Sequence, residues 1–115
     1  MLKNVPELVQ LAAKNVRRID ADTATRELEN NKGLLIDVRE PAEHQAKGAK
    51  GAINIPRGLL EMKVLEIEKD PNRAIYLHCA TSVRAILSAE QLARIGFNNV
   101  SVITCDLDTI QKACE

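Results

Sequence analysis

The chain has 115 residues, the length of one compact domain. Sixteen Lys and Arg residues balance sixteen Asp and Glu residues, and this even charge excludes the clustered basic surface typical of nucleic-acid-binding proteins. No stretch approaches the ~20 consecutive apolar residues of a membrane span, and the N-terminus lacks the apolar region of a signal peptide, so we expect no membrane partner.

Hydrophobic periodicity and turn residues divide the chain into alternating helices and strands. In chain order, the sequence predicts a helix over 6–15, a strand over 16–19, a helix over 23–31, a strand over 34–38, a short helix over 41–46, a strand over 52–55, a helix over 58–68, a strand over 74–78, a helix over 83–95, a strand over 100–104 and a helix over 107–113. Asp20 or Asp22 is expected to cap the second helix, and Gly33 is expected to end it.

This alternation predicts an α/β fold with a mostly parallel five-stranded sheet and helices on both faces. The segment 34–38 is apolar except for Asp37, as expected for a strand that helices cover on both faces. We expect one domain over residues 1–115, with residues 1–16 forming a helical extension packed on it. Only one Phe and one Tyr are present, so the core must be largely aliphatic.

Cys79 lies between the predicted strand 74–78 and the predicted helix 83–95. The first amides of a helix have no intrahelical partner, and the helix end carries partial positive charge. Together with the charge of Arg84, this placement predicts a thiol that loses its proton easily and a loop that binds an anion. The alternative is that Cys79 is a small buried hydrophobic residue.

The number and spacing of the cysteines suggest reduced thiols in a cytoplasmic setting. Three cysteines, Cys79, Cys105 and Cys114, are widely spaced and fit neither a disulfide framework nor a metal site. Asp37, Cys79 and Cys105 all lie at or just past the ends of predicted strands, which predicts one shared crevice. If the last strand pairs beside strand 74–78, Cys105 is a candidate redox partner of Cys79; the alternative is an incidental small residue. Cys114 is expected to be incidental.

Four segments, in this order, resemble the single-domain rhodanese family of sulfurtransferases. They are Leu35-Ile36-Asp37-Val38-Arg39-Glu40-Pro41-Ala42-Glu43, Gly51-Ala52-Ile53-Asn54-Ile55-Pro56, His78-Cys79 with Arg84, and Gly96-Phe97 with Asn99-Val100. The resemblance covers residues 19 to 104. It implies a three-layer rhodanese-like fold and an active-site loop that runs from Cys79 to Arg84.

The resemblance also implies a reaction. Cys79 would be a nucleophile that takes sulfur from a donor such as thiosulfate, becomes a persulfide, and passes the sulfur to cyanide or a thiol. The substrate-binding residues would be Ala80, Thr81, Ser82, Val83 and Arg84. Asp37 and Arg39 would support the crevice. The expected partners are a small sulfur-containing anion, a thiol acceptor and a sulfur-relay protein, with no cofactor and no metal.

Two other classes of function stay open. The related phosphatases have one more residue between Cys and Arg, so this shorter loop favours a sulfur-sized anion over phosphatase or arsenate-reductase chemistry. The chain also departs from the family pattern: Ser82 replaces a glycine of the loop, Lys47-Gly48-Ala49 replaces Gly-His-Ile, and Cys105-Asp106 replaces Gly-Gly. These departures leave open a non-catalytic binding or regulatory module with the same fold.

Overall fold

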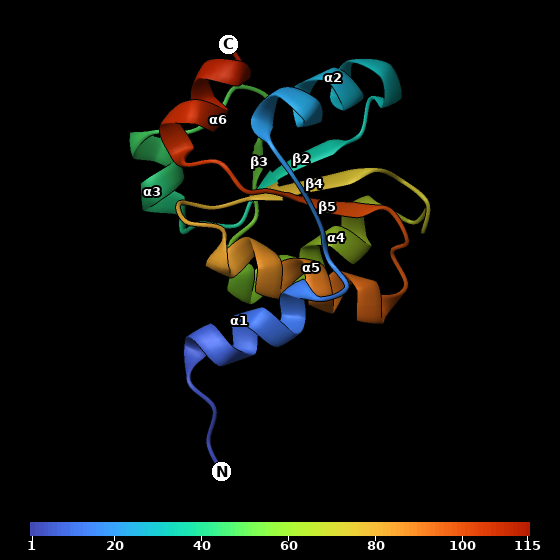
Figure 1. The fold of residues 1–115 in the computed structure, drawn as a ribbon. Helices are drawn as coiled ribbons and strands as arrows, with labels where there is room; N and C mark the ends of the chain where they lie inside the picture. The colour runs from blue at the N-terminus through green and yellow to red at the C-terminus, as the bar shows by residue number, and fades with distance from the viewer.

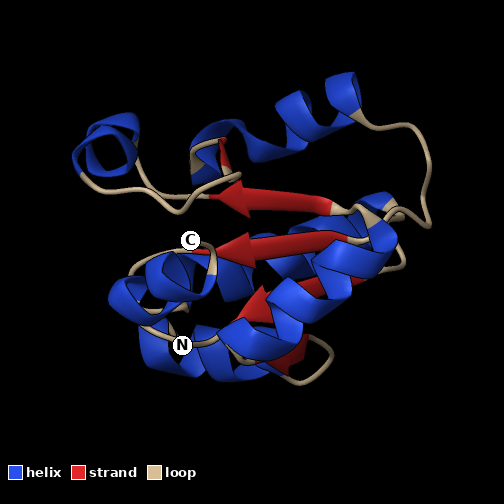
Figure 2. Ribbon diagram, turned by 90° about the horizontal axis from the view of Figure 1, so that it is seen from above, coloured by secondary structure: helices blue, strands red, loops and turns tan.

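A computed structural model describes residues 1–115 and is built on one five-stranded sheet (Figure 1). The strands are β1 (Arg17–Ile19), β2 (Leu34–Asp37), β3 (Ile53–Asn54), β4 (Ile75–His78) and β5 (Val100–Ile103). Their order is β1-β5-β4-β2-β3, and every neighbouring pair is parallel. The strand arrows in Figure 2 accordingly point the same way, so the C-terminal ends of all strands form one edge.

The helices form a layer on each face of the sheet. They are α1 (Val5–Ala13), α2 (Ala21–Asn31), α3 (Pro41–Ala46), α4 (Leu60–Ile67), α5 (Val83–Ile95) and α6 (Leu107–Ala113), with a 3₁₀ turn (Arg57–Leu59) before α4. Figure 1 shows α2 and α6 on one face and α1, α4 and α5 on the other, while α3 lies beside the C-terminal edge of β2. The predicted parallel α/β fold with helices on both faces is therefore confirmed. No helix is long and apolar enough to cross a bilayer.

Strand β4 divides its side chains between two hydrophobic clusters. Ile75, Leu77 and Cys79 join the cluster under α1, α4 and α5, whereas Ala74 and Tyr76 join the cluster under α2 and α6. The alternation follows from the pleat of a strand, which points successive side chains to opposite faces. The thiol of Cys79 consequently lies on the α5 face of the sheet.

Helix α5 has the predicted bounds and packs deeply. Ala85, Ile86, Ala89 and Leu92 are buried on it. Ser88 is also buried, but its hydroxyl donates a hydrogen bond of 2.6 Å to the carbonyl of Arg84, so no polar group is left without a partner there. The helix begins at the residue that follows the Cys79 loop, and its position is fixed by this packing.

Helix α2 ends at the predicted residue, Asn31, but begins two residues earlier than predicted, at Ala21. The side chain of Asp20 accepts a hydrogen bond of 2.8 Å from the amide of Thr23, which confirms one of the two expected caps. Lys32, not Gly33, adopts the left-handed conformation at the end of the helix, with φ of 56°. Gly33 follows the helix as expected, but it does not supply the left-handed conformation at the helix end. Gly33 is needed instead because a Cβ there would lie 2.5 Å from the carbonyl oxygen of Ala74.

Candidate active site

The free thiol of Cys79 lies directly after β4, at the C-terminal edge of the sheet. The residue is only 1% exposed and belongs to the apolar cluster beneath α5. Ala80, Ser82 and Val83 are half-buried around it, and Thr81 is exposed. The predicted nucleophile is thus almost completely shielded from solvent and packs among the apolar residues of this cluster.

The amides that follow Cys79 have no partners inside the protein. The first hydrogen bond of α5 runs from the amide of Ile86 to the carbonyl of Ser82, at 2.8 Å. The six preceding amides, of residues 80–85, donate to no backbone carbonyl and no side chain. Unpaired amides at a helix N-terminus provide the donors and the partial positive charge that an anion requires.

Ser82 takes the backbone conformation that the family pattern assigns to glycine. Its φ is +74°, and only one other residue with a side chain, Lys32, has a positive φ. The left-handed region costs a non-glycine residue of order 1 kcal/mol, so packing of the loop must hold it there. Its hydroxyl makes no capping bond to α5 and remains available for another contact.

Arg84 is bound by an acidic residue that sequence reasoning did not single out. Its Nη1 and Nη2 donate to the two carboxylate oxygens of Glu43, at 2.6 Å and 3.0 Å. The hydrogen bonds from Arg84 lower the pKa of Glu43 to about 2, and the same bonds raise the pKa of Arg84. The only signal in the sequence was that Glu43 closes the segment 35–43 that resembles the family.

Asp37 and Arg39, the predicted supporting pair, form a buried ion pair. Arg39 Nη2 lies 2.7 Å from Asp37 Oδ2 and also donates to the carbonyl of Lys47 at 2.6 Å. His44 Nδ1 lies 2.9 Å from the same Asp37 oxygen. Burial pushes the pKa of Asp37 upward, but the hydrogen bonds from Arg39 and His44 outweigh it and hold the pKa below its ordinary value. These contacts fix α3 to the end of β2, and α3 in turn carries Glu43.

Asn54 fastens the same corner from the edge strand β3. Its amide donates to the carbonyl of Asp37 at 3.0 Å and to that of Arg39 at 2.9 Å. The amide of Ile55 adds a second bond to the Asp37 carbonyl, at 3.0 Å. The segment 51–56 therefore contacts the β2–α3 connection, which leads to Glu43.

His78 is a buried strand residue. It pairs in register with Asp37, is completely buried, and neither ring nitrogen has a hydrogen-bond partner. Burial lowers its pKa, although the charge of Asp37 acts in the opposite direction. The ring is therefore neutral near pH 7, and its side chain points to the face opposite Cys79.

The structure does not bring Cys105 to Cys79. Leu77 pairs with Val102, so Cys79 is level with Thr104, and Cys105 belongs to the cluster on the other face. The Cys105 sulfur instead accepts a hydrogen bond of 3.2 Å from the amide of Ala21. The predicted redox pairing thus gains no support from the geometry.

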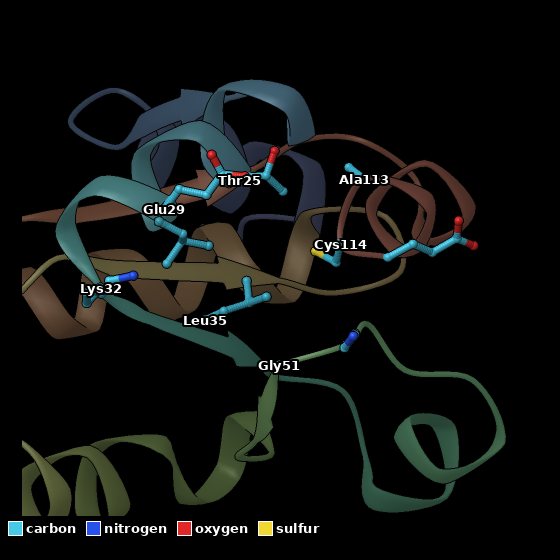
Figure 3. A pocket seen from close by; sticks show the side chains of 11 residues that line it. Thr25, Glu29, Lys32, Leu35, Gly51, Ala113 and Cys114 are labelled. Atoms are coloured by element: carbon cyan, nitrogen blue, oxygen red, sulfur yellow. The ribbon is translucent and has the colours of Figure 1, made fainter.

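Cys114 lies at the C-terminal end of α6, beside the hydrophobic cluster on the other face of the sheet. It is partly buried, and burial raises its pKa. Its side chain lines the largest cavity, of about 470 Å³, which also borders Thr25, Leu35 and Gly51 between α2 and the end of α6 (Figure 3). No residue from Cys79 to Arg84 lines this cavity, so it is separate from the candidate site.

Comparisons with known proteins find related sequences and solved structures with the same fold. The uncharacterized protein YqhL of Bacillus subtilis is 39% identical over 69 residues, which make up 60% of this chain and 53% of that protein. A sulfurtransferase of Allochromatium vinosum is 28% identical over 86 residues, covering 74% of this chain and 78% of its own. The solution structure of the polysulfide-sulfur transferase homodimer from Wolinella succinogenes superposes with a TM-score of 0.77 at 28% identity, covering 92% of this chain and 80% of that one. The rhodanese-like domain model matches residues 20–113, and the chain belongs to this family.

Proposed function

We propose that this protein is a sulfurtransferase that carries a sulfane sulfur on Cys79 as a persulfide. Membership of the rhodanese-like family and the similarity to a sulfurtransferase support sulfur transfer in general. The observation that carries the proposal is the run of six unpaired amides, 80–85, which begins immediately after the Cys79 thiol at the start of α5. Those amides are the donors that a charged terminal sulfur on Cys79 needs.

The reaction has two displacement steps. The Cys79 thiolate attacks the outer sulfur of the donor and forms a new S–S bond with it. The bond that held this sulfur in the donor breaks, and its electron pair stays with the leaving group, which is sulfite when the donor is thiosulfate. An acceptor thiolate or cyanide then attacks the outer sulfur of the persulfide, and the Cys79 thiolate leaves. No electrons are gained or lost overall, so the chemistry needs no cofactor.

Each neighbour of Cys79 has a role in this proposal. The amides of residues 80–84 hold the terminal sulfur, and the hydroxyls of Thr81 and Ser82 add donors at the mouth of the loop. Arg84 closes the loop at the first turn of α5. Asp37 and Arg39 support the site from a distance, through α3 and Glu43. A cytoplasmic setting and a sulfur-relay partner fit a thiol that must stay reduced between cycles.

The proposal is tested by incubating the protein with a sulfur donor and measuring its mass. The reduced protein is incubated with excess thiosulfate, desalted and measured by intact mass spectrometry, and cyanide is then added and thiocyanate is assayed. We expect a mass gain of one sulfur atom that cyanide removes, and no gain in Cys79→Ser. A folded protein that gains no sulfur from any sulfane donor would point to the binding module, and release of phosphate from an aryl phosphate ester would point to the phosphatase alternative.

A further inference from the structure

We propose that the pairing of Glu43 with Arg84 sets the class of sulfur donor, and that the preferred donor is the persulfide of a low-molecular-weight thiol rather than the thiosulfate dianion. This inference rests on the proposed function and narrows it. Thiosulfate brings two negative charges to the loop, whereas the reacting end of an alkyl persulfide brings at most one. The net charge of the side chains around the loop therefore determines which of these two donors the site binds better.

The one cation at the loop is already neutralised. Arg84 uses both terminal nitrogens on Glu43, at 2.6 Å and 3.0 Å, and the low pKa of Glu43, about 2, keeps that carboxylate charged at every physiological pH. A bidentate guanidinium–carboxylate pair leaves little net charge for a third group to feel. A dianion at Cys79 would meet a neutral pair whose carboxylate repels it.

The cations around the loop are compensated in the same way. Arg39 is paired with Asp37 at 2.7 Å, and Arg57 is paired with Glu61 at 2.9 Å. Lys47, at the end of α3, is paired with Asp108. Since these three positive side chains are held by carboxylates, they add little net positive field to attract a doubly charged donor.

The donors that remain are uncharged. The amides of residues 80–85 suit one anionic sulfur, the terminal atom of the Cys79 persulfide, but they do not neutralise a dianion. Cys79 is also only 1% exposed, which favours a slim sulfur chain over a bulky tetrahedral sulfonate group. Charge and access therefore both favour the attack of the Cys79 thiolate on the outer sulfur of R–S–SH, with the R–S⁻ thiolate as the leaving group.

The test compares two donors in three proteins. The rate constants for loading Cys79 are measured by quenched mass spectrometry with thiosulfate and with the persulfide of N-acetylcysteine amide, which carries no other charge. Glu43→Gln removes the carboxylate charge and keeps the side-chain size, while Glu66→Gln makes the same charge change on an exposed face of α4. We expect Glu43→Gln to raise the ratio of the thiosulfate rate constant to the persulfide rate constant about tenfold, and Glu66→Gln to leave this ratio unchanged.

Salt dependence gives a second measurement, and its wild-type arm needs no variant. A free cation at the loop makes the thiosulfate rate fall as ionic strength rises, because salt screens the attraction. We expect no such fall in the wild-type protein and a clear fall in Glu43→Gln, where the charge of Arg84 is released. This arm decides the matter if Glu43→Gln folds poorly, which a thermal melt reveals.

The outcomes separate the two proposals. If both donors load Cys79 but Glu43→Gln leaves their ratio unchanged, or the wild-type thiosulfate rate falls steeply with salt, the inference about the donor is wrong and the sulfurtransferase proposal stands. If neither donor loads Cys79 in the wild-type protein, both proposals fail.

Discussion

The carboxylate of Glu43 accepts hydrogen bonds from both terminal nitrogens of Arg84, and this ion pair connects α3 to the first turn of α5 beside Cys79. The two residues are 41 positions apart in the chain. Glu43 is itself held in place because α3 is fixed to β2 through Asp37, Arg39 and His44. Asp37, Arg39 and His44 are thus connected to the Cys79 loop through the ion pair between Glu43 and Arg84.

Removing Arg84 alone should harm sulfur loading more than removing the pair. Arg84→Met leaves the Glu43 carboxylate without its partner next to Cys79, and that charge opposes both a thiolate and a charged persulfide. We expect loading to slow about 10- to 100-fold, as loss of a hydrogen-bonded charge costs about 1.5–3 kcal/mol. The double variant Glu43→Gln with Arg84→Met should recover at least part of the rate. Equal rates in the single and double variants would show that Glu43 does not act through its charge.

The backbone of Ser82 gives a prediction about stability. At φ of +74°, Ser82→Gly removes side-chain strain, so its free energy of unfolding should equal or exceed the wild-type value by up to ~1 kcal/mol. Ser82→Val should lose about 1–2 kcal/mol, because a β-branched residue fits this region worst. Urea unfolding measures both, and Thr81→Val, next to it in the loop at negative φ, is the matched control. A Ser82→Val variant as stable as Thr81→Val would contradict the strained loop.

His78 should make stability depend on pH. Its pKa in the folded protein lies below the ordinary 6.5, so between these values the unfolded chain takes up a proton that the folded protein does not. The free energy of unfolding should therefore fall as the pH falls below 6.5, by at most about 1.4 kcal/mol per pH unit.

The test compares urea unfolding at neutral and mildly acidic pH. His78→Leu, which fills the site with an apolar side chain, should lose this part of the slope, whereas His44→Gln should keep it. Equal slopes in wild type and His78→Leu would show that folding does not lower the pKa of His78.

Gly33 is predicted to be intolerant of any side chain. A Cβ at this position would lie 2.5 Å from the backbone oxygen of Ala74, at the start of β4, and backbone cannot move aside cheaply. Gly33→Ala should lower the free energy of unfolding by about 1–3 kcal/mol. Gly58→Ala is the matched control, because nothing lies within 4 Å of the Cβ it would add, and its stability should change by less than about 1 kcal/mol. A melting temperature equally unaffected in both variants would refute the steric argument.

The sequence predicted most of the architecture because its patterns are strong. Three helices, 41–46, 83–95 and 107–113, have the expected bounds, since proline or polar residues mark their starts and apolar stripes mark their length. The end of α2 at Asn31 was predicted correctly, but the left-handed conformation there belongs to Lys32 rather than to glycine, the usual residue at such a position. The close approach of the Gly33 and Ala74 backbones arises from tertiary packing, and the residues around Gly33 in the sequence do not indicate it.

The candidate site was harder to predict wherever it depends on register. The neighbouring strands of Cys79 and Cys105 were expected correctly, but the pairing of Leu77 with Val102 puts the two thiols on opposite faces. A shift of one residue in that register would have reversed the result, and sequence alone does not fix it. Glu43 escaped notice for a similar reason, because only the folded chain brings α3 against α5.

The most direct test of the account is to find where the sulfur resides. The protein is loaded with a sulfane donor, its thiols and persulfides are alkylated, and the peptides that contain Cys79, Cys105 and Cys114 are analysed by mass spectrometry. The account predicts one additional sulfur on the Cys79 peptide and none on the other two. Sulfur distributed over all three cysteines, or found on Cys105 or Cys114 while Cys79 stays a thiol, would contradict it.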